Sequence, residues 1–332
     1  GASDNTLPYA REYMEIILLG NAITHLYFGL NAVLRAASKP RQAMYTTIFT
    51  VILNAILDPL FIYTFGLGIR GAAYATVLSQ FVALIWQFWI FSNPTELIHL
   101  KRGIYSLRGD LMKNIIGIGI SPFSMNVCAC MVVIFINNQL VRFGGDMSVG
   151  AFGIANRIVF IFVMFVMGIN QGMQPIAGYN YGAQKLDRMM QVVKLSIIAA
   201  TVIMILGWFL AMLAPRQCVS LFTTDLHLIE TTVHGMRRMM LMLPIVGYQM
   251  VITNFFQCIG KVKISIFLSL SRQLLFLLPA LALLPIWFGL DGVWLAQPVS
   301  DFIASVVTAW IMIVYMHKFK LQHKENQYGR QE

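Results

Sequence analysis

An acidic residue lies inside an otherwise apolar stretch of this chain. Asp58 follows Asn54 by four residues in the run Asn54-Ala-Ile-Leu-Asp58-Pro, and residues four apart share one face of a helix. A carboxylate in the hydrocarbon layer of a membrane costs about 2.5–3.5 kcal/mol, so it normally faces a bundle interior and marks an ion pathway. The pattern favours ion-coupled transport. The alternative is a structural carboxylate that caps neighbouring backbone.

A third polar side chain is expected at the same depth as Asp58. The short turn between two apolar runs centres near Leu67, and Asp58 lies nine residues before it while Thr76 lies nine residues after it. In an antiparallel helix pair these two residues are level. Carboxylate, amide and hydroxyl oxygens suit a small hard cation, and a carboxylate alone can carry a proton. We therefore predict a cation site formed by Asn54, Asp58 and Thr76, with either sodium or a proton as its ion.

A second pair of charges lies in a later hairpin. Arg272 and Asp301 stand at nearly equal distances from a turn near residue 286. An arginine and an aspartate at matched depth in a membrane neutralise each other. We predict a structural ion pair there, in contrast to Asp58, whose hairpin offers no such partner.

Amide side chains without charge are scattered along the later apolar runs. Together with Phe, Tyr and Met they are able to line a cavity that accepts varied amphipathic cations. Their default role is hydrogen bonding between helices. The candidates for a substrate cavity are Asn137, Asn170, Gln171, Gln174 and Asn254.

Motifs of enzymatic chemistry do not occur in the sequence. It contains no phosphate-binding Gly-rich loop, no His-Glu-x-x-His and no nucleophile elbow. We therefore predict that the protein is not an enzyme, that no residue is catalytic and that it needs no cofactor. The expected ions are the coupling sodium or proton, with no other metal site.

The composition requires a membrane for these residues to act in. Hydrophobic residues make up 58% of the 332 and charged residues 11%, with a mean hydropathy of +0.70, whereas soluble domains average about 25% charged residues. A span needs about 20 apolar residues. We predict an all-α integral membrane fold with about nine helices, near residues 13–34, 43–65, 70–92, 113–141, 149–177, 190–214, 235–258, 262–285 and 290–316.

The basic residues predict the orientation of these helices. Alternate loops carry sixteen Lys and Arg residues in one set and four in the other, and the remaining four lie within or at the ends of helices. Cytoplasmic loops are enriched in such residues. The bias therefore places the carboxyl terminus in the cytoplasm, and it explains the net charge of +10 without a nucleic acid partner.

A short internal repeat predicts two lobes. Five residues recur at a constant offset of 221: Gly71, Ala75, Ser79, Phe81 and Ala83 correspond to Gly292, Ala296, Ser300, Phe302 and Ala304. Parallel repeats of this kind build two-lobed transporters with a substrate site between the lobes. We predict an incomplete amino-terminal lobe of three helices and a linker at residues 1–105, and a complete carboxy-terminal lobe of six helices at residues 106–332.

Three segments resemble one known family. Residues 168–189 read Gly-Ile-Asn-Gln-Gly-Met-Gln-Pro-Ile-Ala-Gly-Tyr-Asn-Tyr-Gly-Ala-Gln-Lys-Leu-Asp-Arg-Met, which resembles the multidrug and toxic compound extrusion (MATE) family of cation-coupled antiporters. The run from Leu34 to Arg41, followed by Asn54 and Asp58, is similar to that family too. So is Gln257-Cys-Ile-Gly-Lys261, followed by Ser271-Arg-Gln273. The resemblance covers the whole chain as the last nine of the family's twelve helices.

The resemblance implies a mechanism and a location. Asn54, Asp58 and Thr76 occupy the positions of the family's amino-terminal-lobe sodium or proton site, which an aspartate on the family's first helix completes. The implied protein is a monomeric antiporter of a bacterial cytoplasmic membrane. It exports amphipathic or cationic small molecules by alternating access, and its other contacts are membrane lipids.

Three alternatives stay open. A related lipid-linked oligosaccharide flippase usually needs a strongly cationic cavity, which the few intramembrane arginines do not favour. An enzyme acting on lipid needs clustered polar residues at one interface, whereas His99, His227, His234 and His317 are scattered. The third alternative is a non-transporting remnant that lacks the first three helices, in which case the predicted ion site is incomplete.

Overall fold

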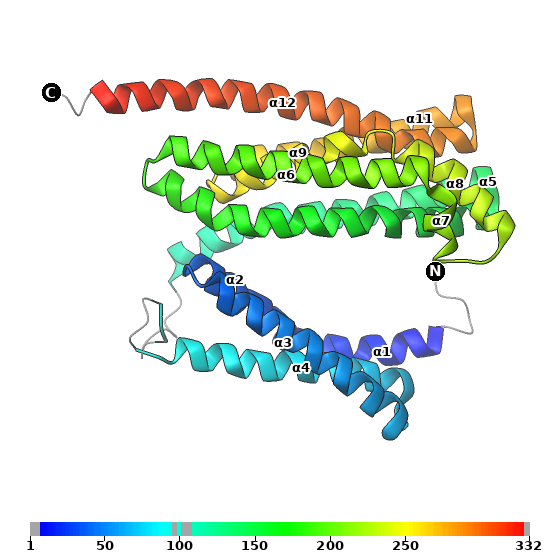
Figure 1. Cartoon of the computed structure of the whole chain (residues 1–332), viewed down its shortest axis with the longest axis horizontal. Coiled ribbons are helices and arrows are strands. Elements are labelled where there is room, and N and C mark those ends of the chain that lie inside the picture. The colour runs from blue at the N-terminus through cyan, green and yellow to red at the C-terminus, as the bar shows by residue number, and fades with distance from the viewer. Residues whose placement is uncertain (1–6, 95–97, 101–107, 329–332) are drawn as a thin grey trace. The chain divides into compact units, whose positions relative to one another are not determined.

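The protein is described by a computed structural model, which covers residues 7–94, 98–100 and 108–328, with side chains for 7–94, 98–100, 108–120 and 122–317. The described residues are almost entirely helical (Figure 1). The chain divides into two compact units, unit 1 at Gly1–Arg108 and unit 2 at Gly109–Glu332. The predicted lobe boundary at 105/106 lies outside the described residues.

Unit 1 consists of two helix pairs. Helix α4 contacts α1, α2 and α3, and its own packing residues are mostly small, such as Ala73, Ala75 and Ala83, none of which is exposed. Small residues let membrane helices approach closely. The elements are α1 Leu7–Leu19, α2 Asn21–Ala36, α3 Pro40–Pro59, the π-helical turn η1 Leu60–Thr64 and α4 Gly68–Phe91.

Unit 2 holds the larger apolar core. Helices α5, α6 and α12 run along the length of the unit (Figure 1), the shorter α9 packs against all three, and Phe255, Phe256 and Trp294 are buried among them. The elements are α5 Gly109–Gly182, α6 Leu186–Leu213, α7 Pro215–Ser220, α8 Leu226–Met239, α9 Leu243–Cys258, α10 Val262–Leu270, η2 Ser271–Leu277, α11 Leu278–Phe288 and α12 Leu290–Tyr328.

The described helices suffice for nine membrane spans. Six are long and apolar enough by themselves, and two bent pairs, α1 with α2 and α8 with α9, each provide one more. Helix α5 supplies two spans, because Gly145 interrupts it with φ 69° and ψ −175°. Only 11% of the apolar window in Pro40–Thr64 is buried, so most of its side chains face the surroundings, as a lipid-facing helix requires. The prediction of an all-α integral membrane protein is confirmed.

The structure corrects two details of the predicted helices. The span expected at 13–34 is broken at Gly20, and the pair bends by 56°. The span expected at 235–258 is likewise two helices with a bend of 56°, because Pro244 begins a new helix at α9 and cannot continue the one before it. Helix α5 continues through Pro122 and Pro175 and is interrupted at Gly145, between the spans predicted at 113–141 and 149–177.

The repeat predicted from sequence is visible in the backbone. Gly68 and Gly289, 221 residues apart, both take the left-handed conformation, at φ 54° and 58°, which favours glycine. A Cβ at Gly71 would lie 2.7 Å from the Phe61 carbonyl, and one at Gly292 would lie 2.3 Å from the Leu284 carbonyl oxygen. Both hairpins therefore reverse and close in the same way, each within its own unit.

Candidate functional site

The α3–η1–α4 hairpin positions the predicted cation site in unit 1. Asp58 is the last residue before Pro59, and the chain then passes into the π-helical turn Leu60–Thr64. Such turns are rare and occur frequently at functional sites. Close contact of Gly71 with the Phe61 backbone holds the start of α4 against this turn. The hairpin therefore carries Thr76 to the level of Asp58.

The three predicted side chains meet in the structure. Asn54 Nδ2 donates a hydrogen bond to Asp58 Oδ1 at 3.2 Å and approaches Thr76 Oγ1 at 3.5 Å. Thr76 Oγ1 donates its own proton to the Ala72 carbonyl at 2.9 Å. All three side chains are half-buried.

Several oxygen lone pairs remain available in this group. Within the described part of the chain, Asp58 accepts only the bond from Asn54 and forms no ion pair. Thr76 Oγ1 faces Asn54 Nδ2 at 3.5 Å, and Asn54 Oδ1 forms no hydrogen bond among the described residues. No group of three or more His, Cys, Asp or Glu occurs among the described residues, so the arrangement is one carboxylate with two neutral oxygens. Chemically, such a set is able to hold one proton or one small hard cation.

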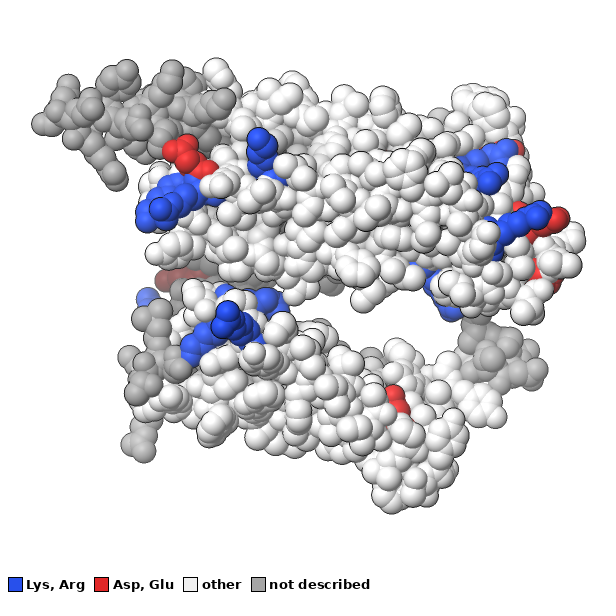
Figure 2. Space-filling view, viewed as in Figure 1, with Lys and Arg blue, Asp and Glu red and all other residues white. Residues whose placement is uncertain are grey.

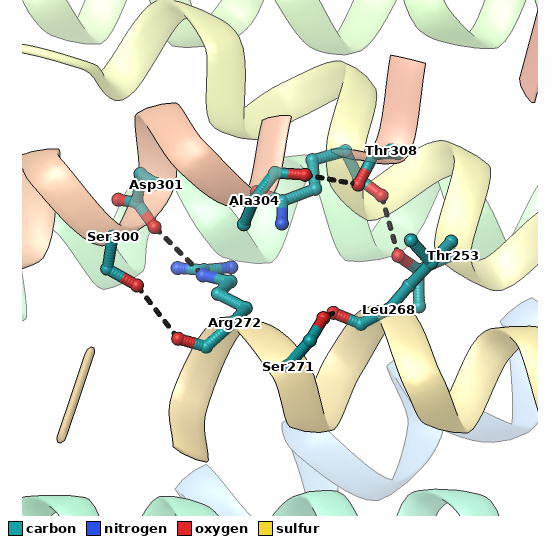
Figure 3. A network of polar contacts seen from close by, with 9 residues as sticks. Thr253, Leu268, Ser271, Arg272, Ser300, Asp301, Ala304 and Thr308 are labelled. Carbon is teal, nitrogen blue, oxygen red and sulfur yellow. Dashed lines mark hydrogen bonds and ion pairs between the residues drawn. The ribbon is translucent and has the colours of Figure 1, made fainter. Parts of the chain in front are cut away.

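The charged pair of unit 2 is arranged differently. Arg272 Nε lies 2.8 Å from Asp301 Oδ1, although the N–H does not align as a hydrogen bond to that oxygen. The Asp301 side chain is 6% exposed and that of Arg272 26%. Figure 3 shows the guanidinium pointing at the carboxylate, while Ser300 donates to the Arg272 carbonyl at 2.8 Å. The guanidinium group of Arg272 therefore already neutralises this carboxylate.

Four of the five predicted cavity residues line one cavity in unit 2. The cavity has a volume of about 320 Å³, and Asn170, Gln171, Gln174 and Asn254 are on its wall. Gln174 Nε2 donates to Asn254 Oδ1 at 3.0 Å, so these two amides also serve the expected role of joining helices. Asn137 does not belong to this wall.

Three further amides of the same wall are not among the five predicted residues: Gln249, Gln257 and Gln273. Gln249 and Gln273 both line the cavity, and their Oε1 atoms are buried without a hydrogen-bond partner among the described residues. Both side-chain polar atoms of Asn170, whose side chain is only 2% exposed, are in the same condition. Buried polar groups are normally satisfied by protein or water. Three unsatisfied acceptors around one cavity therefore indicate a place for N–H or O–H donors.

Arg272 stands between this cavity and a second one. The second cavity, about 290 Å³, is lined mainly by apolar side chains together with Asn156, Gln297 and Asp301. Arg272, Gln273 and Met250 line both cavities. The ion pair is thus positioned to separate an amide-lined space from an apolar one.

Comparisons with known proteins give one consistent result. The family model named MatE matches residues 1–60 and 120–281. A multidrug export protein MepA of Staphylococcus aureus (strain bovine RF122 / ET3-1) is 26% identical over 321 residues, which are 97% of this chain and 70% of that protein. The MepA protein of Staphylococcus haemolyticus (strain JCSC1435) is 28% identical over 310 residues, 92% of this chain and 68% of that protein.

Solved structures show the same similarity in three dimensions. An outward-facing multidrug resistance MATE family transporter of the MOP superfamily superimposes with a TM-score of 0.87 at 25% identity, over 96% of this chain and 72% of that one. A MOP superfamily transporter from Pyrococcus furiosus, described as having a binding pocket of reverse polarity that suggests a different function, gives a TM-score of 0.89 at 25% identity over the same shares.

Proposed function

Because this chain belongs to the MATE family, we propose that it is a secondary transporter that exports amphipathic or cationic drugs in exchange for sodium ions or protons. Support comes from its similarity to the multidrug export proteins of two staphylococci. In this proposal the protein acts in a bacterial cytoplasmic membrane by alternating access and carries out no enzymatic reaction.

The single observation that carries the ion coupling is the isolated carboxylate of Asp58. It lies within a membrane span and has one neutral hydrogen-bond donor, Asn54, among the described residues. An uncompensated carboxylate there is costly, and binding a proton or a sodium ion removes that cost. Neutralising Asp58 is therefore expected to change the relative stability of the protein's conformational states.

Ion binding drives export only when it favours one conformation over another. A ligand that binds both states equally shifts nothing. The structure suggests where the difference arises, because Asn54 and Asp58 lie on α3 while Thr76 lies on α4. Movement of α4 against α3 would separate the hydroxyl from the carboxylate and so change the affinity for the ion.

The amide-lined cavity of unit 2 supports the proposed substrate class. Its unsatisfied acceptors on Asn170, Gln249 and Gln273 match the N–H groups of organic cations, and Met125, Met167 and Met250 on the same wall adapt to different apolar shapes. The proposed site therefore binds through neutral oxygens and methionines rather than through a fixed negative charge.

The experiment that tests this function is ethidium efflux from cells without other drug exporters. Wild-type protein is expected to export the dye in response to an inward sodium or proton gradient. Asp58→Asn is expected to reduce gradient-driven efflux to background, because the amide has no negative charge with which to bind a proton or a sodium ion. Asp146→Asn serves as the matched control, since Asp146 is an exposed aspartate of the other unit. This variant should retain full efflux activity. Full gradient-dependent efflux by Asp58→Asn would exclude the assigned site.

The same assay separates the two coupling ions. Efflux that follows an imposed pH gradient in sodium-free buffer identifies a proton, whereas efflux that needs a sodium gradient at equal pH on both sides identifies sodium. Dye export that ignores both gradients would contradict secondary antiport altogether.

A further inference from the structure

A groove that has no role in the proposed export lies between α6, α9 and α12 of unit 2. It has a volume of about 810 Å³. Tyr248 and Ile252 of α9 contribute to it, and Ile252 is only 3% exposed, whereas Ile198 of α6 and Ile313 of α12 are 50% and 68% exposed. Helix α9 is therefore the floor, and α6 and α12 are the walls of a groove that is open to the surroundings.

The walls are built by regular helix faces. Helix α6 contributes residues from Asp187 to Ile198, and α12 contributes residues from Ala309 to His317, spaced three or four apart on each helix. Eleven residues of helix rise about 16 Å, about half of a hydrocarbon core of ~30 Å. The groove thus has the length of one leaflet of a bilayer.

The polar residues of the groove are gathered toward one end. Asp187, Gln191 and Lys194 come from the first turns of α6, and His317 lies past the apolar part of α12, while Ile197, Ile198 and Ala309 line the other end. On the face shown in Figure 2, charged side chains are confined to the two ends of unit 2 and the band between them is uncharged. The polar end of the groove therefore coincides with the end of the unit that the charge bias assigns to the cytoplasm.

The ammonium group of Lys194 at this end is free to bind an anionic ligand. Lys194 and His317 form no ion pair or hydrogen bond within the described part of the chain, whereas Asp187 already has an interaction partner. Lys194 is exposed and belongs to the groove lining, and its flexible stem lets the ammonium group extend toward the membrane surface. An anionic group beside an apolar chain of one leaflet complements this arrangement.

We propose that this groove binds one phospholipid of the cytoplasmic leaflet, with its phosphate on Lys194 and an acyl chain along the Ile197, Ile198 and Met312 surface. The phosphate is matched by the unpaired ammonium group, and the acyl chain is matched by the length and apolar lining of the groove. The site lies wholly in unit 2 and does not depend on the proposed drug export.

Native mass spectrometry of the detergent-purified chain tests this site. Phosphatidylglycerol with two oleoyl chains is titrated into the protein, and dioleoylglycerol, which has the same chains without phosphate, is the comparison ligand. Wild-type protein is expected to bind one phosphatidylglycerol with high affinity and dioleoylglycerol more weakly. Lys194→Gln should weaken phosphatidylglycerol binding about fivefold, the effect of about one basic residue near an anionic leaflet.

Two further variants complete the test. Ala309→Phe fills the groove without changing its charge and should weaken both lipids, with thermal unfolding used to verify that the variant is folded. Lys263→Gln removes an exposed lysine outside the groove and should bind like the wild type. Equal binding by wild type, Lys194→Gln and Ala309→Phe would overturn the proposal. A groove that binds only a second copy of the chain, or ethidium in place of the lipid, would overturn it as well.

Discussion

At the scale of single residues, Thr76 supplies the neutral hydroxyl of the proposed cation site. Its hydroxyl proton is committed to the Ala72 carbonyl, so the oxygen is left as an acceptor, and Asn54 Nδ2 approaches it at 3.5 Å. A carboxylate alone binds a proton, whereas a sodium ion needs several oxygens around it. The contribution of this hydroxyl therefore distinguishes the two ions.

We predict that Thr76→Val raises the sodium concentration needed for half-maximal dye efflux roughly tenfold, because a ligand worth about 1–1.5 kcal/mol is lost. Thr76→Ser keeps the hydroxyl and should behave like the wild type. The measurement is the rate of ethidium efflux against sodium concentration at fixed pH. An unchanged sodium requirement in Thr76→Val would remove this residue from the site.

The pair of Arg272 and Asp301 makes a different prediction, about stability. Removing one partner of a buried ion pair leaves an uncompensated charge and costs about 3–5 kcal/mol, while replacing both by apolar residues is often neutral. Asp301→Asn should therefore lower the thermal midpoint of the purified protein strongly, and the double variant Arg272→Met/Asp301→Leu should recover most of it. Unfolding followed by tryptophan fluorescence in detergent measures both. A double variant as unstable as the single one would show that the pair does more than neutralise itself.

At the scale of elements, the approach of α4 to the turn before it fixes the geometry of the proposed cation site. The path of the backbone leaves no room for a side chain at Gly71, where a Cβ would lie 2.7 Å from the Phe61 carbonyl carbon and oxygen. Because the obstacle is backbone, it cannot rotate away as a side chain does. The start of α4 has to move if any other residue is placed there.

We predict that Gly71→Ala destabilises unit 1 by about 1–3 kcal/mol, the usual cost of overpacking, and reduces gradient-driven efflux by displacing Thr76. Gly153→Ala is the control, since nothing lies within 4 Å of a Cβ at that position and alanine favours helix. Thermal unfolding and efflux are measured on the same preparations. Wild-type stability and activity in Gly71→Ala would contradict the close contact.

The sequence predicts the spans of this protein better than their interruptions. Apolar runs of about 20 residues are a strong signal because a bilayer demands them. The break at Gly20 lies where the helix packs closely on α4, since a Cβ at Gly20 would lie 2.4 Å from a methyl carbon of Val77, and no local pattern shows such a contact. The turn before α9 has a local signal in Pro244, but the segment Leu226–Met239 carries His234, Arg237 and Arg238, which obscure its place in a bent span.

The two candidate sites were predictable to different degrees. Asn54, Asp58 and Thr76 follow from helix periodicity and the position of one short turn, so the sequence brings them together correctly. What they bind stays a prediction. The amide cavity draws on α5, α9 and η2, and the rotation of each helix about its own axis decides which amides face it. Gln249 and Gln273 were therefore missed, and Asn137 was included although it lies elsewhere.

At the scale of the whole molecule, the distribution of charge predicts the topology. The loops that hold most Lys and Arg residues alternate with loops that hold few, and both ends of unit 2 carry charges around an uncharged band (Figure 2). The positive-inside rule then assigns the start of α6 to the cytoplasm and the loop between α7 and α8 to the outside.

We predict that green fluorescent protein fused to the carboxyl terminus is fluorescent in bacterial cells, because it folds in the cytoplasm. Alkaline phosphatase fused after Asp225, between α7 and α8, should be active, since that enzyme requires the outside. Reporter fluorescence and phosphatase activity are compared at equal expression. The opposite pattern would invert the orientation of every helix.

The duplicated hairpin has a consequence for how many ions one cycle uses. Both copies retain the glycines that fold them, yet in the first the acid is unaccompanied and in the second Arg272 stands beside Asp301. A single codon change at position 272 would give the second copy an acid with no resident counter-charge. In the proposed antiport, the number of coupling ions is thus separable from folding, because a variant that tolerated the lost stability would carry a second acid able to bind an ion.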